Sequence, residues 1–352
     1  MNLTTSLAVT LTLVLTSYTA FSAEQHYQIT DLGTLGGDTS RSYSINDFGD
    51  IVGRSRETLK PDGKKGLRSA FLYTNNHMIN LGNFGGNNTV ARSVNSSRQV
   101  VGYSRPTDST HYKAFLYEYG EMKNLGTLES GLLSYAYAIN DYGQVVGQSH
   151  TNKSGTTSEA FIYEDEEMIG LGTLGGNSSG AFDINAEGVV VGTSTLGEPS
   201  YDIQAFIYEY EEMTSLGSLD DTGYSEARAI NDSNQVVGNS LTKSGSYHAF
   251  LYEEGEMHDI GSIEGDSFAY DINNNGQIVG SHRSHLLEGN GLAYLYENKK
   301  MKNLNDLLAE KDKAKWNLTE AFGINDRGQI VGWGKLDKKD HAYLLKPVQV
   351  PE

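Results

Sequence analysis

The chain has 352 residues, among them 40 Gly, 22 Tyr and 11 Phe but no cysteine. A chain without cysteine cannot form disulfides, thiolate zinc sites or a cysteine nucleophile. The net charge of −18 disfavours nucleic acid and anionic lipid headgroups as partners, because both are polyanions.

Residues 1–23 are predicted to be a secretory signal peptide. Residues 6–15 form an apolar run too short to span a membrane, and small residues follow it, so cleavage is expected near residue 22 or 23. No Lys or Arg precedes the run, and an uncleaved amphipathic start is the alternative. The mature chain, residues 24–352, is expected to be monomeric, without membrane insertion, and secreted to a bacterial periplasm or exterior.

Seven copies of one repeat fill the mature chain. Each copy carries, in the same order, segments like Leu-Gly-Thr-Leu, Ile-Asn, Val-Gly and Ala-Phe-Leu-Tyr. The Ile-Asn segments begin at residues 45, 94, 139, 184, 230, 272 and 324 and are therefore 49, 45, 45, 46, 42 and 52 residues apart. A period in this range with four short strands per unit is typical of β-propeller blades.

The four segments of each repeat are predicted to be strands joined by two tight turns. Residues 134–140 alternate small and large side chains, as a strand does, and Asn-Asp-Tyr-Gly (140–143) is a hairpin turn. The last turn position is Gly or Asn in six repeats but Arg98 in one, an anomaly where a positive φ is expected. The longer connections follow the second and fourth strands, and they are expected on the opposite face from the turns.

The two ends of the chain predict how the ring closes. Residues 27–33 form a lone fourth strand, whereas residues 341–345 form a third strand with no fourth strand after it. We therefore expect a seven-bladed β-propeller of four-stranded blades, closed by the N-terminal strand, which removes the open sheet edges. A linear β-solenoid is the alternative, but it gains nothing from this permuted start.

The first strand of each repeat presents two ranks of side chains. Three residues before each Ile-Asn segment stands Ser42 or an alanine, and two residues before it stand the larger Tyr43, Arg92, Tyr137, Phe182, Arg228, Tyr270 and Phe322. We expect the two ranks to interdigitate between neighbouring blades, large against small.

The repeat resembles the HAF (His-Ala-Phe) extracellular repeat family of bacteria. The matching residues are His248-Ala249-Phe250 and the variant His341-Ala342-Tyr343, together with Ile-Asn-x-x-Gly-Gln-Val-Val-Gly at 139–147. The resemblance implies an exported repeat protein of unassigned activity and carries over no catalytic residue.

Two repeated motifs have a structural and a functional interpretation. A hydroxyl stands five residues before each Ile, as at Ser134, and either satisfies backbone groups or lines a sugar-binding pore. Residues 271–276 match half of a calcium loop, but position twelve is His282 rather than Glu, so a hairpin turn is favoured.

Departures from the repeat near the longer-loop face are the predicted ligand-binding residues. They are Arg41, Tyr135, Glu226, Phe268 and Glu320 four residues before the Ile, Arg92 and Arg228 two residues before it, and Trp333 at the start of the last long loop. Arg with aromatic residues fits a sugar or peptide, although Arg92 and Arg228 could instead stack between blades.

These observations predict an exported, non-enzymatic binding or scaffold propeller that recognises a glycan, peptide or surface protein on its longer-loop face. One alternative is a carbohydrate-active hydrolase or lyase that uses carboxylates such as Glu226 and Glu320, since paired acids need no proximity in sequence. The other is a purely structural envelope or matrix protein. No catalytic residue, cofactor or metal is predicted.

Overall fold

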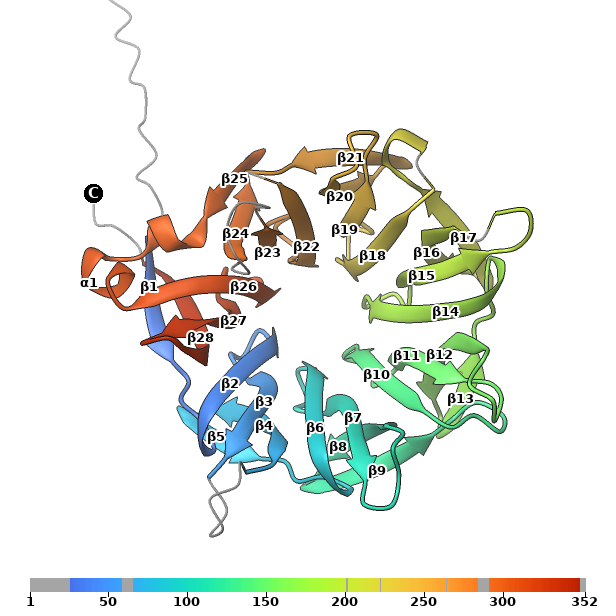
Figure 1. Cartoon of the computed structure of the whole chain (residues 1–352), viewed down its shortest axis with the longest axis horizontal. Coiled ribbons are helices and arrows are strands. Elements are labelled where there is room, and N and C mark those ends of the chain that lie inside the picture. The colour runs from blue at the N-terminus through green and yellow to red at the C-terminus, as the bar shows by residue number, and fades with distance from the viewer. Residues whose placement is uncertain are drawn as a thin grey trace, which may run out of the picture.

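The computed structural model describes residues 26–58, 66–200, 202–221, 223–263, 265–283 and 291–348. The predicted signal peptide, residues 1–23, therefore lies outside the described residues. The fold is all-β and propeller-like, with sheets arranged around a central opening (Figure 1). In the described part of the chain, no helix is long and apolar enough to cross a membrane.

Each strand of the repeat keeps one place in its sheet. The first strands line the central opening and are β2 (Gly36–Ile45), β6 (Gly85–Val94), β10 (Ser134–Ile139), β14 (Gly175–Ile184), β18 (Ser225–Ile230), β22 (Asp266–Ile272) and β26 (Trp316–Ile324). The second strands are β3 (Ile51–Glu57), β7 (Val100–Pro106), β11 (Val145–His150), β15 (Val190–Leu196), β19 (Val236–Leu241), β23 (Ile278–Arg283) and β27 (Ile330–Leu336).

The third and fourth strands lie farther from the opening. The third strands are β4 (Arg68–Thr74), β8 (Lys113–Glu118), β12 (Ser158–Glu164), β16 (Ile203–Glu209), β20 (Tyr247–Glu253), β24 (Leu292–Glu297) and β28 (Lys339–Val348). The fourth strands are β5 (His77–Asn80), β9 (Glu121–Gly126), β13 (Glu167–Gly170), β17 (Glu212–Gly217), β21 (Glu256–Gly261), β25 (Lys300–Asn303) and β1 (His26–Asp31). Successive strands pair antiparallel, and single parallel bridges, Arg68 to Asn88 and Ser158 to Ser178, link four neighbouring units in two pairs.

The first strand of the described chain pairs with the last. β1 runs antiparallel to β28, from His26 opposite Val348 to Asp31 opposite Tyr343, so that Ile29 lies opposite Leu345. The Tyr27 ring is buried in a core cluster with Leu307 and Leu308. The first and last strands of the described residues thus share one sheet, in the order β1-β28-β27-β26.

The hydrophobic core consists of separate clusters between successive repeats. One cluster joins Val52 and Leu72 of the first repeat to Ala91 and Phe115 of the second. An equivalent cluster contains residues of the last and first repeats, including Val331, Ala342, Leu344, Ile45 and Phe71. Each unit therefore buries its apolar side chains against a neighbour, as repeat architectures do.

Two sequence features are explained by close packing and backbone geometry. A Cβ at Gly53 would lie 2.8 Å from the Phe71 ring and 2.1 Å from the Arg41 carbonyl oxygen, so the Val-Gly glycine makes room for its neighbours. Arg98 has the expected positive φ, 62°, and its Nε donates to the Asp50 carboxylate of the preceding repeat at 2.8 Å.

The predicted packing of the two side-chain ranks was wrong for the large rank. The small residues, such as Ser42 and Ala91, are fully buried between sheets, but the large residues line the central channel. A β-bulge in every first strand, for example between Ala136 and Ala138, interrupts the alternation there. Two consecutive residues of six first strands, such as Phe182 and Asp183, therefore line the channel, whereas β26 contributes Phe322 alone.

The last repeat departs from the prediction in two places. Short helices, η2 (Leu304–Leu307) and α1 (Glu310–Lys313), lie between β25 and β26, just as η1 (Leu219–Asp221) precedes β18. Trp333 lies within β27 and is buried, not in a long loop, because β27 and β28 are joined by a two-residue turn at Asp337 and Lys338.

Candidate functional site

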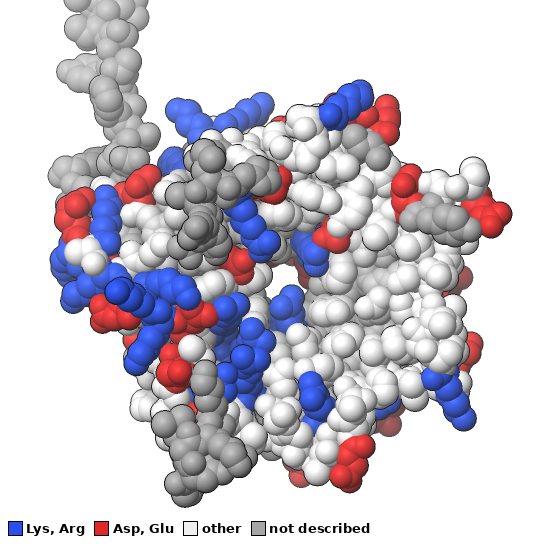
Figure 2. All heavy atoms as spheres, in the orientation of Figure 1, with Lys and Arg blue, Asp and Glu red and all other residues white. Residues whose placement is uncertain are grey.

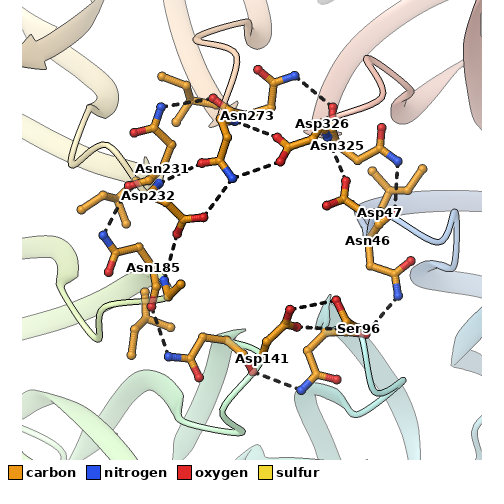
Figure 3. A pocket seen from close by; sticks show the side chains of 18 of the residues that line it. Asn46, Asp47, Ser96, Asp141, Asn185, Asn231, Asp232, Asn273, Asn325 and Asp326 are labelled. Atoms are coloured by element: carbon orange, nitrogen blue, oxygen red, sulfur yellow. Dashed lines mark hydrogen bonds between the residues drawn. The ribbon is translucent and has the colours of Figure 1, made fainter.

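The face that carries the inner hairpin turns, here called the turn face, is held by a ring of buried asparagines (Figure 3). The Nδ2 of each asparagine donates to the backbone oxygen of the asparagine in the next repeat, with N···O distances of 2.9–3.3 Å. The ring runs through Asn46, Asn95, Asn140, Asn185, Asn231, Asn273 and Asn325, whose Nδ2 donates back to Asn46. Because every repeat makes the same contact, we assign this ring to structure.

Carboxylates surround the mouth of the channel on the turn face. Asp141 accepts hydrogen bonds from the backbone N and the hydroxyl of Ser96, both at 2.8 Å, and Asp47 accepts one from the Asp326 backbone N at 2.9 Å. They line a cavity of about 240 Å³. Each of these acids caps a turn of a neighbouring repeat, and the described residues include no group of three or more His, Cys, Asp or Glu that could hold a metal ion. The Asn273–Gly276 segment is a hairpin turn, as the sequence favoured over a calcium loop.

Five of the seven repeated hydroxyls satisfy the same two backbone groups, as their structural interpretation predicted. The Ser179 hydroxyl donates to the Gly172 carbonyl and accepts from the Ala160 backbone N at 2.8 Å. Ser40, Ser134, Ser225 and Ser267 make equivalent pairs of contacts.

The channel is narrowed by a girdle of seven large side chains, one from each first strand. Ring centroids lie 5.3 Å apart for Tyr43 and Phe322, 4.8 Å for Tyr270 and Phe322, and 5.3 Å for Tyr137 and Phe182. The Arg92 guanidinium lies 4.8 Å from the Tyr43 centroid and 5.8 Å from that of Tyr137, and Arg228 lies 4.7 Å from that of Phe182. Arg92 and Arg228 thus stack between neighbouring repeats, as the alternative interpretation predicted, on rings of the adjoining first strands that line the channel.

Two carboxylates lie next to the girdle, in a channel cavity of about 220 Å³. The Asp183 Oδ2 accepts from the Ile230 backbone N at 2.9 Å, and the Asp271 Oδ2 accepts from Ile324 N at 2.8 Å. Burial raises the pKa of Asp183 to about 7, and burial together with the Asp183 charge raises the pKa of Asp271 to about 8.

The opposite face, here called the loop face, carries a concentration of positive charge. Figure 2 shows Lys and Arg gathered beside the central opening over β2, β6 and β27, whereas the surface over β10 and β14 is largely uncharged. Two adjoining hollows of about 210 and 380 Å³ share Arg56 and Arg68 in their walls. We call the five arginines that line them the arginine cluster: Arg41, Arg54, Arg56, Arg68 and Arg105.

Few acids neutralise the arginine cluster. Asp340 pairs with Arg41 at 2.6 Å and also contacts Lys335, and Asp38 lies 3.4 Å from Arg56. Across the described ranges, Arg54, Arg68 and Arg105 form no ion pair with an acid. Burial and then the charges of Arg54, Arg56 and Arg41 lower the pKa of Arg68.

Four predicted residues form one chain of contacts at the loop face. The Arg41 guanidinium lies 3.7 Å from the Trp333 ring centroid, and the Trp333 Nε1 donates to Glu320 at 2.9 Å. Glu320 also accepts from Arg283 at 3.2 Å, and Arg283 lies 5.1 Å from the Phe268 centroid.

The remaining predicted residues occupy two further places. Glu226 pairs with Arg228 and accepts from the Tyr224 hydroxyl at 2.8 Å. Tyr135 packs edge-on against Tyr103 with centroids 4.8 Å apart, and Tyr112 lies next to both rings. Arg92 lies in the channel girdle rather than at the mouth.

Sequence reasoning missed four members of the arginine cluster, and it considered Asp271 only as the first residue of a calcium loop and not as a channel acid with Asp183. Arg54, Arg56, Arg68 and Arg105 come from β3, β4 and β7, so only the neighbouring sheets bring them together. A detectable signal for Asp183 and Asp271 was that they are the only acids directly before an Ile-Asn segment.

Comparisons with known proteins show the family and the fold. The model of a family described as "Protein of unknown function (DUF3466)" matches residues 37–174 and 176–343. The expected membership of the HAF repeat family was wrong, because no such family matches; the shared Ile-Asn and Val-Gly segments meet general requirements of turns and strand packing. No curated protein matches the chain.

Several solved structures share the propeller fold at low identity. The β-propeller domain of the Trilobed protease from Pyrococcus furiosus is 10% identical with a TM-score of 0.58, and the match covers 90% of this chain and 97% of that one. An oligogalacturonate lyase in complex with manganese is 13% identical with a TM-score of 0.59, covering 93% and 95%. TolB from Acinetobacter baumannii is 10% identical with a TM-score of 0.50, covering 91% and 66%. At these identities the likeness extends to the fold alone.

Proposed function

The chain belongs to the family described as proteins of unknown function (DUF3466), and we propose from its geometry that it is an exported, non-enzymatic propeller whose loop face binds an acidic glycan. The observation that carries this proposal is the arginine cluster, five guanidinium groups around two adjoining hollows with few acids to neutralise them. Arg54, Arg68 and Arg105 have no acid partner among the residues described, so their charge is available to an anion in a chain whose net charge is −18.

Arginine matches the geometry of an anionic group. A planar guanidinium donates two parallel hydrogen bonds to a carboxylate or sulfate, and such charge-assisted bonds are about twice as strong as neutral ones. Arg56 and Arg68 stand between the two hollows, so each can contact anionic groups on successive units of one chain.

The surroundings of the cluster favour a sugar chain over other anions. Tyr112 accepts through its hydroxyl from Asn88 at 2.7 Å and from Arg105 at 3.1 Å, beside the rings of Tyr103 and Tyr135. Amide groups and aromatic rings next to guanidinium groups provide hydrogen bonds for hydroxyls and apolar surface for pyranose rings.

The carboxylates at the mouth support binding rather than catalysis. Glu226 is engaged by Arg228 and Tyr224, and Glu320 by Arg283 and Trp333. A general acid requires a free proton-transfer path to the substrate, whereas these two carboxylates are held as ion-pair acceptors.

The ring architecture that presents this face is part of the proposal. We infer seven four-stranded blades, with β1 as the outer strand of the last. The support is the pairing of β1 with β28, the core cluster between the last and first repeats, and the hydrogen bond from Asn325 to the Asn46 carbonyl.

Binding of the mature protein to an immobilised glycan panel tests the function. We expect polygalacturonate, alginate or heparin to bind more tightly than neutral dextran, with affinity that falls as salt rises. Arg56→Gln and Arg68→Gln should each weaken binding about 10-fold, or about 1.4 kcal/mol, whereas Arg327→Gln on the turn face removes the same charge without effect.

Three outcomes would replace this proposal. Tighter binding to polyglutamate or to single-stranded DNA would assign the arginine cluster to a peptide or a nucleic acid. Product release from an acidic polysaccharide, abolished by Glu226→Gln, would favour a hydrolase or lyase. Lattice or cell-wall association without any glycan binding would favour a structural envelope protein.

A further inference from the structure

We infer that the channel cavity is a second ligand site, distinct from the arginine cluster, which binds a small zwitterion with its carboxylate at Arg92 and its ammonium group at Asp183 and Asp271. The site does not depend on the glycan-binding proposal, because its walls come only from the inner strands. Its volume of about 220 Å³ admits a small molecule rather than a polymer.

The positive wall of the cavity is a guanidinium without a hydrogen-bond acceptor. Arg92 Nε is buried and has no partner, and the residues described give the rest of its guanidinium no acceptor either, only the faces of Tyr43 and Tyr137. Arg228 differs, since Glu226 pairs with it. An unpaired buried donor is costly, so Arg92 provides a free anion site in the channel.

The negative wall consists of Asp183 and Asp271, which the fold itself does not require. Each accepts a backbone N–H from the next inner strand, but the other five repeats build the same strand with a small side chain at that position. These small residues are Ser44, Ser93, Ala138, Ala229 and Gly323. Two desolvated carboxylates facing one cavity are stabilised by a cation between them.

Both walls together select a ligand that carries both charges. A simple anion at Arg92 would be repelled by the two carboxylates, and a simple cation would be repelled by Arg92. A zwitterion satisfies both walls, and the rings of Phe182 and Tyr270 add favourable faces for an ammonium group.

Calorimetric titration with a graded series of ligands tests the site. The series runs from glycine to 6-aminohexanoate, so that the charge separation increases stepwise, with the n-alkyl carboxylate and n-alkylamine of matched length as single-charge controls. We expect at least one zwitterion to bind 10-fold or more tightly than both of its controls. Absence of binding across the series, or equal binding of a single-charge control, would overturn the inference on the unaltered protein alone.

Variants then assign the two walls. Arg92→Gln should weaken the best zwitterion about 10-fold and shift the preference towards the amine, and Asp271→Asn should shift it towards the carboxylate. Arg68→Gln in the arginine cluster is the matched control and should leave channel binding unchanged. If Arg68→Gln abolished zwitterion binding, the ligand would belong to the loop face and the channel site would be wrong.

Discussion

The turn face and the loop face are built from the same repeats but use them in opposite ways. On the turn face every repeat contributes the same asparagine contact to its neighbour, so the surface is a closed set of satisfied hydrogen bonds. On the loop face the repeats differ, and three arginines have no acid partner among the residues described. Uniform contacts stabilise the ring, while departures from uniformity create a place for a ligand.

The largest expected effect concerns the seam between the two chain ends. A chain that begins at Thr34 loses β1, six paired residues and the buried Tyr27 ring. We expect the free energy of unfolding to fall by about 5 kcal/mol or more, from lost burial and hydrogen bonds. Urea unfolding measures this free energy, and a substitution of an exposed residue on the same strand, Gln28→Ala, is the control. If the shortened chain unfolded like the intact chain, closure by β1 would be disproved.

The second largest loss of folding stability is expected when an asparagine of the turn face is replaced. Asn231→Ala removes the donor to the Asn273 carbonyl at 3.1 Å and the acceptor for two N–H groups of its own turn. Because the site is buried, we expect a loss of about 2–4 kcal/mol in thermal unfolding. The exposed Ser233→Ala in the same turn should be neutral, and an equal effect of both changes would mean that the ring is not structural.

The channel acids should oppose folding at high pH. The pKa values of Asp183 and Asp271 are raised by folding, to about 7 and about 8, so their contribution is most favourable below about pH 4 and is lost as pH rises towards 8. Asp271→Asn should therefore stabilise the protein by about 1 kcal/mol or more at pH 8.5, and by little at pH 4. Melting temperatures of Asp271→Asn and the unaltered protein between pH 4 and pH 8.5 measure this stabilisation. A difference in melting temperature that does not change with pH would contradict the prediction.

Replacing an arginine of the arginine cluster on the loop face is expected to have the smallest effect on folding stability. The sign of this effect should be opposite to that of Asn231→Ala on the turn face. Burial and then the charges of Arg54, Arg56 and Arg41 lower the pKa of Arg68, so Arg68→Gln relieves a repulsion. We expect unchanged or slightly greater stability, by less than about 1 kcal/mol, together with about 10-fold weaker glycan binding. A clear destabilisation would show that the arginine cluster supports the fold rather than a ligand.

Much of the fold follows from the sequence because every repeat carries the same kinds of turn and strand residues. The hairpin turns follow from Asn and Gly where a positive φ is required, and even the anomalous Arg98 adopts it. The pairing of the first strand with the last follows from an incomplete repeat at each end. The short helices between β25 and β26 were not foreseen, because their segments of four residues carry no periodic signal.

The candidate sites follow from the sequence only in part. The chain of contacts through Arg41, Trp333, Glu320 and Phe268 contains only residues that the repeat pattern singled out, apart from Arg283. The arginine cluster could not be predicted from the net charge of −18, because this value is a sum over the whole chain and does not show how charges are distributed between the two faces.

The sequence by itself determined the repeat, its four strands and its turns, since these depend on residues close together in the chain. Only the tertiary structure decided which side chains face the axis, because a bulge in every inner strand resets the alternation on which sequence patterns rely. Only the tertiary structure, too, placed Arg54, Arg68 and Arg105 around adjoining hollows, because their proximity depends on how neighbouring sheets are packed.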